Sequence, residues 1–214
     1  IAIWRDSGLE IVGQQTRWGV WPRFVMAQFL PADTIAVFDD DTIPGPRWLE
    51  NCVKSAALTG PAVLGCCGQS YIGGDRQNRI YHGWKLPSHH IVECDVAEHC
   101  WFFPRELLLD WEDAPYIQFP LTGEQYYLSV QAQRRGWKTY ALAHPPENKD
   151  WWGSIDGMNL GTDEHALWQQ PGAEAEKQAV HDYYVQRGWS PSALRFDEVG
   201  NIVANAKPAT WVMK

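Results

Sequence analysis

Short apolar runs alternate with segments of helical periodicity along most of the chain. Between Trp48 and Ala56, apolar residues recur three and four positions apart, and Gly60-Pro61 follows, which predicts a helix over 47–58. The same reasoning predicts further helices over 21–30, 104–111, 124–135 and 162–187, the last one interrupted near Pro171-Gly172. Apolar or alternating runs predict strands over 1–4, 10–13, 34–38, 62–65, 91–96 and 138–142, and a hairpin of 70–72 with 79–81.

Strands that alternate with helices predict an α/β sandwich with a mostly parallel central sheet. The length of 214 residues, with 45% hydrophobic and 21% charged residues, fits one soluble globular domain with an ample core. In such sheets ligands bind beyond the carboxyl ends of the strands. Polar residues that directly follow a predicted strand are therefore the first candidates for a site.

Charge, hydropathy and cysteine content limit the cellular compartments and the binding partners that we expect for this protein. The net charge of −8 gives no general attraction to nucleic acid or to an anionic membrane, although a local basic groove stays compatible with it. No apolar run reaches the ~20 residues of a transmembrane helix, and no secretory signal is visible. The five cysteines lack metal-binding spacing and read as reduced thiols, which favours a cytoplasmic setting. The sequence begins at Ile1 without a Met, so an upstream signal stays open.

Three consecutive acids, Asp39-Asp40-Asp41, end the apolar run 35–38 and precede a Pro/Gly turn. Carboxylates crowded at a strand end repel one another and are costly to bury. A divalent cation removes that cost because hard cations take carboxylate oxygens as ligands, and it offers its free positions to phosphate oxygens. The segment therefore predicts a metal and phosphate site, with a solvated acidic turn as the alternative.

Four blocks of sequence resemble the GT-A fold glycosyltransferases, in particular the family 2-like and exostosin-like members. Asp39-Asp40-Asp41 resembles their DxD motif, and three later blocks follow in the family's order. These are His99-Cys100-Trp101-Phe102-Phe103, Thr122-Gly123-Glu124-Gln125 with the helix start after it, and Gly136-Trp137-Lys138-Thr139-Tyr140 followed by His144-Pro145-Pro146. The resemblance covers about residues 1–155.

The resemblance implies a Rossmann-like GT-A core over 1–155, with 156–214 as a helical extension packed on it in a single domain. It implies that the segment 1–4 matches the second strand of that fold, so we expect the family's first strand to be lacking here. The implied activity is a metal-dependent hexosyl transfer from a nucleoside-diphosphate sugar, UDP-linked by preference, to a hydroxyl acceptor. Mn²⁺ and Mg²⁺ both suit the oxygen ligands.

Among the three acids, Asp41 is the first choice as direct metal ligand. Asp39 is expected to contact the ribose or the sugar, or to reach the metal directly or through water. Asp40 has the weakest case as a donor-binding residue, because adjacent side chains on an extended chain point opposite ways. The resemblance suggests a metal or pyrophosphate contact for His144, and a loop or capping histidine is the alternative.

Two arginines and one loop are candidates for holding the donor. The resemblance suggests that Arg23, or less favourably Arg17, contacts the nucleotide phosphates, which a planar guanidinium binds with two parallel hydrogen bonds. Solvation at the surface is the alternative for both. In the long loop 144–161, Trp152 and its neighbour Trp151 are expected to close over the sugar on glycine hinges, or to anchor a surface loop.

Glu124 is the candidate base that removes the proton of the acceptor hydroxyl in an inverting transfer. Family members often carry Glu-Asp here, whereas this chain has Glu124-Gln125, and Gln takes no proton at neutral pH. Asp95, which the resemblance makes a sugar-binding acid, is the alternative base, and a retaining reaction assisted by the leaving phosphate is another. The aromatic block His99–Phe103 is expected to wall the acceptor, or to belong to the core.

Other functions stay open at this level. Glu124-Gln125 is compatible with a non-catalytic nucleotide-sugar-binding relative. A metal-dependent nucleotidyltransferase shares acidic clusters and α/β sheets, although no Gly-rich phosphate loop is visible. A transferase acting on hydroxymethylated bases in DNA is a minority alternative, which the acidic balance of the chain disfavours.

Overall fold

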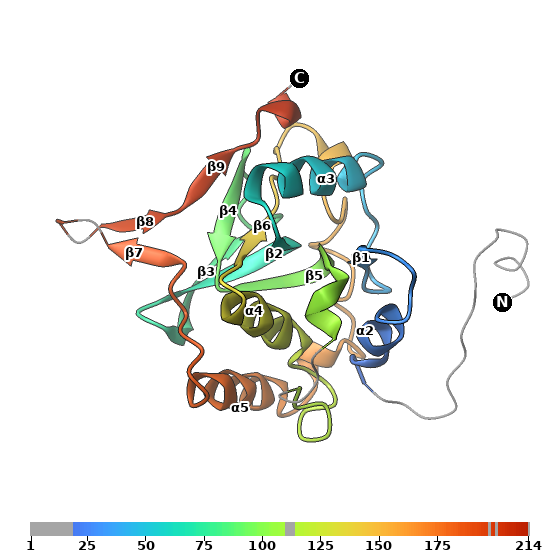
Figure 1. Cartoon of the computed structure of the whole chain (residues 1–214), viewed down its shortest axis with the longest axis vertical. Coiled ribbons are helices and arrows are strands. Elements are labelled where there is room, and N and C mark those ends of the chain that lie inside the picture. The colour runs from blue at the N-terminus through green and yellow to red at the C-terminus, as the bar shows by residue number, and fades with distance from the viewer. Residues whose placement is uncertain (1–18, 110–113, 197, 200, 214) are drawn as a thin grey trace, which may run out of the picture.

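The computed structural model describes residues 19–109, 114–196, 198–199 and 201–213. The strands expected over 1–4 and 10–13, and Arg17, lie outside the described residues. The described residues form an α/β fold with one large open sheet at its centre (Figure 1). No helix of the described part is both long and apolar enough to cross a membrane.

Seven strands form the central sheet, and most of its pairings are antiparallel. Six of them run in the order β1 (Thr34–Val37), β5 (Val96–Pro104), β2 (Ala62–Ile72), β6 (Lys138–Ala141), β4 (His90–Cys94) and β9 (Ala206–Pro208), and β3 (Asp75–His82) pairs with β2. Among the described strands, β2 and β6 are the pair that runs parallel. The expected mostly parallel sheet is therefore wrong.

Strand β5 takes part in two of the five antiparallel pairings of this sheet. Its residues were expected to form an aromatic wall and the start of a helix over 104–111, but the strand runs on to Pro104, and a short 3-10 turn, Arg105–Leu108, follows. It enters the sheet between β1 and β2 and is antiparallel to both. β5 follows β4 after the single residue Asp95, so no helix lies between these two strands of the chain.

Helices cover both faces of the sheet. On one face, α2 (Pro22–Ala27), α4 (Glu124–Arg134) and α5 (Ala173–Val185) share a core with Val63, Trp101 and Phe103. On the other, α3 (Trp48–Thr59) packs with Leu64 and Cys100. Neighbouring strand residues such as Val63 and Leu64 therefore point into different cores, as a pleated sheet requires.

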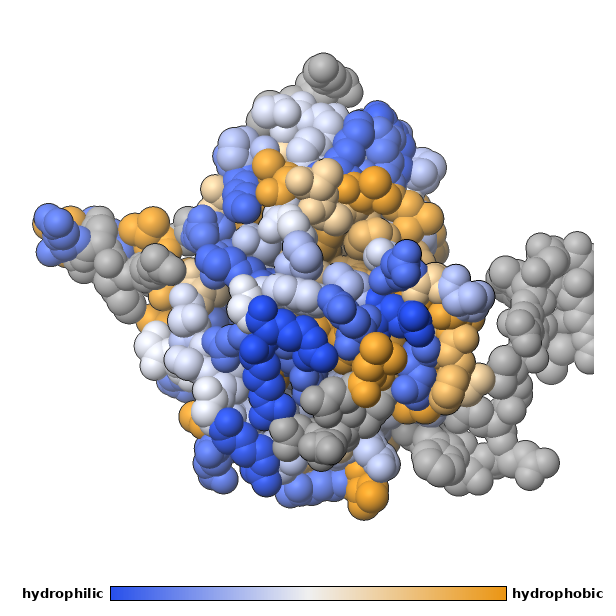
Figure 2. All heavy atoms as spheres, in the orientation of Figure 1, coloured by the Kyte–Doolittle hydropathy of each residue, from blue (hydrophilic) through white to orange (hydrophobic). Residues whose placement is uncertain are grey.

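The amphipathic pattern of 47–58 predicted α3 but not its orientation. The helix buries Trp48 and Cys52 and leaves Leu49 and Val53 more than half exposed. Apolar side chains thus stay accessible along α3. Figure 2 shows apolar and polar residues side by side on the visible face of the molecule. A helix whose apolar residues cover a wide arc fits more than one burial pattern, and the packing partner decides.

The C-terminal segment 156–214 differs from the helical extension that was expected. Its α-helix, α5, begins only after Gly172, whose φ of +87° favours glycine, and a single 3-10 turn, Leu167–Gln169, precedes it. The hairpin of β7 (Leu194–Phe196) and β8 (Ile202–Ala204) comes next. After it, β9 joins the edge of the central sheet beside β4, and the 3-10 turn Thr210–Met213 ends the described chain. Sheet pairing therefore ties this segment to the rest of the fold.

Candidate metal and acid–base site

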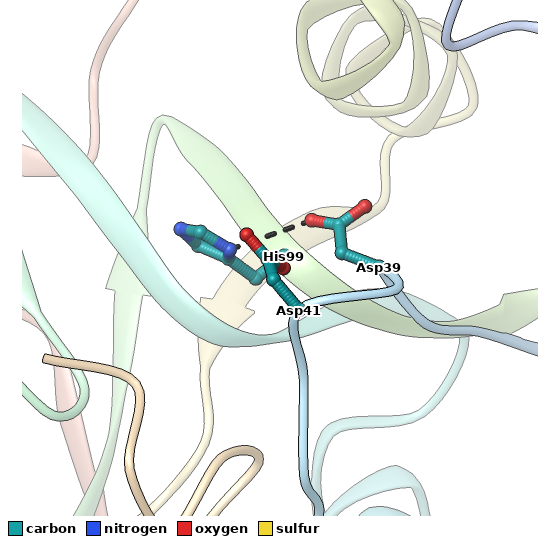
Figure 3. A group of neighbouring side chains, drawn as sticks. All are labelled: Asp39, Asp41 and His99. Carbon is teal, nitrogen blue, oxygen red and sulfur yellow. Dashed lines mark ion pairs between the residues drawn. The ribbon is translucent and has the colours of Figure 1, made fainter. Parts of the chain in front are cut away.

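Two of the three aspartates converge with a histidine just beyond the end of β1. Asp39 and Asp41 lie in the loop after this strand. His99 lies on β5, two residues before Trp101, which is the first residue of β5 that pairs with β1. One ligand atom from each of the three side chains lies within 4.8 Å of the other two (Figure 3). Asp40 is exposed and lies outside this group, and it belongs to a turn rather than to the extended chain that was expected.

His99 owes its place to an irregularity of β5. The register of β2 with β5 passes from Gly65–Trp101 to Cys67–Glu98, so that two residues of β5 face one of β2, which is a β-bulge. His99 has a φ of +66°, the only positive value at a non-glycine position among the described residues. The Trp84 ring lies against the imidazole at 4.7 Å between centroids. The bulge and this ring together turn His99 toward the aspartates.

The charges of this group are only partly balanced by the protein. Asp39 forms an ion pair with Arg23, and its Oδ2 lies 3.4 Å from Nδ1 of His99. Burial lowers the pKa of His99, but the hydrogen bond and charge of Asp39 outweigh it, so the net shift is upward. Burial, followed by the charge of Asp39, raises the pKa of Asp41. Oδ1 of Asp41 is buried without a hydrogen-bond partner, so a cation at this point satisfies a group that the described protein atoms leave unsatisfied.

Glu124 joins this group through Arg23. It is the first residue of α4, its side chain is buried, and Oε1 accepts a hydrogen bond from Nη2 of Arg23 at 3.2 Å. Burial raises the pKa of Glu124 to about 7, Arg23 opposes the rise, and Asp39 adds to it. Oε2 has no hydrogen-bond partner among the described atoms. A carboxylate whose pKa lies near neutrality is suited to take up and release a proton.

Arg23 is held between the two acidic groups by its surroundings. It lies at the second position of α2, and its guanidinium carbon is 5.2 Å from the centroid of the Trp101 ring. One terminal nitrogen, Nη1, donates a hydrogen bond to Asp39, and the other, Nη2, donates one to Glu124. The arginine therefore couples the candidate metal ligands to the candidate base, and its remaining donor Nε has no partner in the described part of the protein.

The long loop touches the site through glycines. An added Cβ at Gly161, where φ is +63°, would lie 1.8 Å from Oδ2 of Asp41. An added Cβ at Gly157 would lie 2.7 Å from the Trp84 ring, and one at Gly153 would lie 1.8 Å from the Cβ of Cys66. The lack of a side chain at Gly161 and Gly157 thus allows the loop to pack closely against Asp41 and Trp84.

We expect Gly161→Ala to lower the affinity for a divalent cation by about 10-fold or more, because the new methyl group displaces the Asp41 carboxylate. Calorimetric titration with Mn²⁺ measures the effect. Gly172→Ala is the matched control, since φ there is +87° and nothing lies within 4 Å of an added Cβ. Both variants carry a backbone cost of about 1–2 kcal/mol, and equal cation affinities in the two would contradict the close contact at Asp41.

Three sequence-predicted residues lie outside this group. His144 is buried, with Nδ1 donating to the carbonyl of Leu142 at 2.9 Å and Nε2 accepting from the amide of Gly153 at 3.3 Å. Burial lowers its pKa to about 4, so the ring is neutral and both nitrogens are engaged by the backbone. The structure thus assigns His144 to the alternative of a loop-organising histidine, and leaves it no lone pair for a metal.

Asp95 and Trp152 are likewise engaged elsewhere. Asp95 lies between β4 and β5 and accepts three backbone hydrogen bonds, from Tyr71, Ser192 and Ala193, at 2.7–2.9 Å. Burial raises its pKa and these amides oppose the rise. Through Ser192 and Ala193, these hydrogen bonds connect Asp95 to the C-terminal segment. Trp152 is buried and donates from its indole to the carbonyl of Pro145, which fits the alternative of an aromatic anchor.

His99 is the site residue that the sequence reasoning missed as a ligand. It was placed in the aromatic block, and Trp101 and Phe103 of that block are indeed core residues. The missed signal is a polar residue inside an apolar strand pattern, which often marks a bulge or a site. A search of protein-family profiles finds no match to this sequence, and no curated protein matches it either.

Proposed function

We propose that this protein is a metal-dependent glycosyltransferase that moves a sugar from a nucleoside diphosphate, UDP by preference, to a hydroxyl acceptor. The observation that carries the proposal is the convergence of Asp39, Asp41 and His99 with Arg23 and Glu124 beyond one strand end. A transfer of this kind needs a cation site for the diphosphate, a cationic side chain beside it and a proton acceptor. Each requirement has a residue here.

The group fits a divalent cation on three grounds. Its ligand atoms are mutually close, Oδ1 of Asp41 is buried without a partner, and the Gly161 backbone leaves no room for a side chain there. Asp39 and Asp41 would hold the ion, with Mn²⁺ and Mg²⁺ both compatible with carboxylate oxygens. When bound, such an ion neutralises the charge that develops on a departing diphosphate.

The protein's own residues supply the remaining steps. Arg23 donates hydrogen bonds and positive charge next to the cation site, where diphosphate oxygens would lie. Glu124 would accept the proton of the acceptor hydroxyl as the hydroxyl oxygen bonds to the anomeric carbon and the bond from that carbon to the nucleoside diphosphate breaks. Because Asp95 is engaged by three backbone amides, Glu124 is the favoured base, and a base that activates the acceptor favours inversion at that carbon.

Release of free nucleotide from a panel of UDP, GDP and TDP sugars, with Mn²⁺ or Mg²⁺ and a panel of hydroxyl acceptors, tests the proposal. We expect UDP release that requires the metal. Turnover of a nucleoside triphosphate with a sugar phosphate would instead indicate a nucleotidyltransferase. Tight donor binding without release would indicate a non-catalytic binding protein, and release that depends on DNA containing hydroxymethylated bases would identify the acceptor as nucleic acid.

A further inference from the structure

We infer that His99 is the third protein ligand of the cation site and that it makes the site select a transition-metal ion such as Mn²⁺ over Mg²⁺. The inference shares the cation site with the proposed function but does not depend on sugar transfer. It concerns the identity of the ion, which the two aspartates by themselves leave open.

The imidazole of His99 adds a nitrogen to the carboxylate oxygens that can bind a cation here. Arg23 engages one oxygen of Asp39, which leaves Oδ2 directed at the site, 3.4 Å from Nδ1 of His99. Asp41 offers Oδ1, which is buried and has no partner. With the imidazole, three side chains each bring one ligand atom to the same point (Figure 3).

The chemistry of the third ligand decides the selectivity. Mg²⁺ demands oxygen ligands in a near-ideal octahedron and gives up its water reluctantly. Imidazole nitrogen is a softer donor that transition-metal ions accept, whereas Mg²⁺ gains little from it. Replacing one carboxylate by a histidine therefore favours Mn²⁺ relative to Mg²⁺.

The fold holds His99 in this place from three directions. The bulge in β5 sets its backbone, and the Trp84 ring supports the imidazole at 4.7 Å. Gly157 in turn packs closely against Trp84, where an added Cβ would lie 2.7 Å from the ring. A ligand fixed before the ion arrives loses little entropy on binding, which strengthens its contribution.

Titration of the whole protein with Mn²⁺, followed by the electron paramagnetic resonance signal of the ion with and without UDP, tests the inference. Mg²⁺ competition in the same samples measures selectivity. We expect His99→Asn to weaken Mn²⁺ binding by about 10-fold or more and Mg²⁺ binding much less, because Asn accepts a positive φ but lacks the imidazole. His90→Asn, at an exposed position of β4, is the matched control and should match the wild type.

Pulsed electron paramagnetic resonance separates a ligand role of His99 from a merely structural one, because it detects nitrogen bound directly to Mn²⁺. Mn²⁺ bound to the wild type should show coupling to a histidine nitrogen, and this coupling should vanish in His99→Asn. His99→Gly, which also suits a positive φ, should lose the coupling too and replaces the first variant if that one folds poorly. Persistence of the nitrogen coupling, an unchanged preference between Mn²⁺ and Mg²⁺, or failure of the wild type to bind Mn²⁺ in either condition would overturn the inference. Loss of sugar transfer with these signals intact would count against the proposed function alone.

Discussion

Asp41→Asn should abolish metal-dependent donor binding, with a loss of about 100-fold or more in UDP affinity in the presence of Mn²⁺. The amide keeps the size of the side chain but removes the negative charge. In the folded protein this carboxyl carries a buried oxygen without a partner, next to the ligand atoms of Asp39 and His99. The substitution therefore removes the ligand that most needs a cation.

Calorimetry with UDP, in the presence and absence of Mn²⁺, measures this effect. Asp40→Asn is a matched control because it makes the same chemical change one residue away, at a side chain that is exposed and outside the group. It should bind UDP within about threefold of the wild type, since surface substitutions usually have small effects. Donor affinity that survives in Asp41→Asn, or falls equally in both variants, would remove the metal site from the proposal.

Glu124→Gln should lower the rate of sugar transfer by about 100-fold or more and leave UDP affinity nearly unchanged. Gln keeps a hydrogen-bond acceptor for Arg23 but cannot take a proton. Initial rates of nucleotide release at saturating donor measure turnover, and calorimetry measures affinity. Glu174→Gln makes the same change at another helix start, where the carboxylate also pairs with an arginine, Arg76, and should retain full turnover.

The pH dependence of the same reaction gives an independent check on Glu124. Because burial raises the pKa of this carboxyl to about 7, it is protonated and inactive as a base at pH 5–6. Turnover should therefore rise with pH and level off above about 8, and the rise should be centred near pH 7. In Glu124→Gln the residual rate should lose this rise. A wild-type profile that is flat from pH 5 to 8 would place the base elsewhere.

Local patterns in the sequence predicted the elements that build the candidate site. The apolar run before Asp39 predicted β1, helical periodicity predicted α3, and the start of α4 placed Glu124 at a helix terminus. The crowding of acids after a strand singled out Asp39 and Asp41 as candidate cation ligands, and both belong to the group that the structure brings together. Each prediction rests on neighbours within a few residues, where backbone geometry alone fixes which side chains share a face.

Only the tertiary structure decided which distant residues share the site. The pairing of β5 with β1 and β2, and the bulge in β5, bring His99 close to the aspartates. Hydrogen bonds to the backbone engage His144 and Asp95 away from this group. The direction of a strand and the burial of a histidine depend on partners far away in the chain. Those partners are chosen by packing and by the satisfaction of buried hydrogen bonds across the whole fold, which no local pattern encodes.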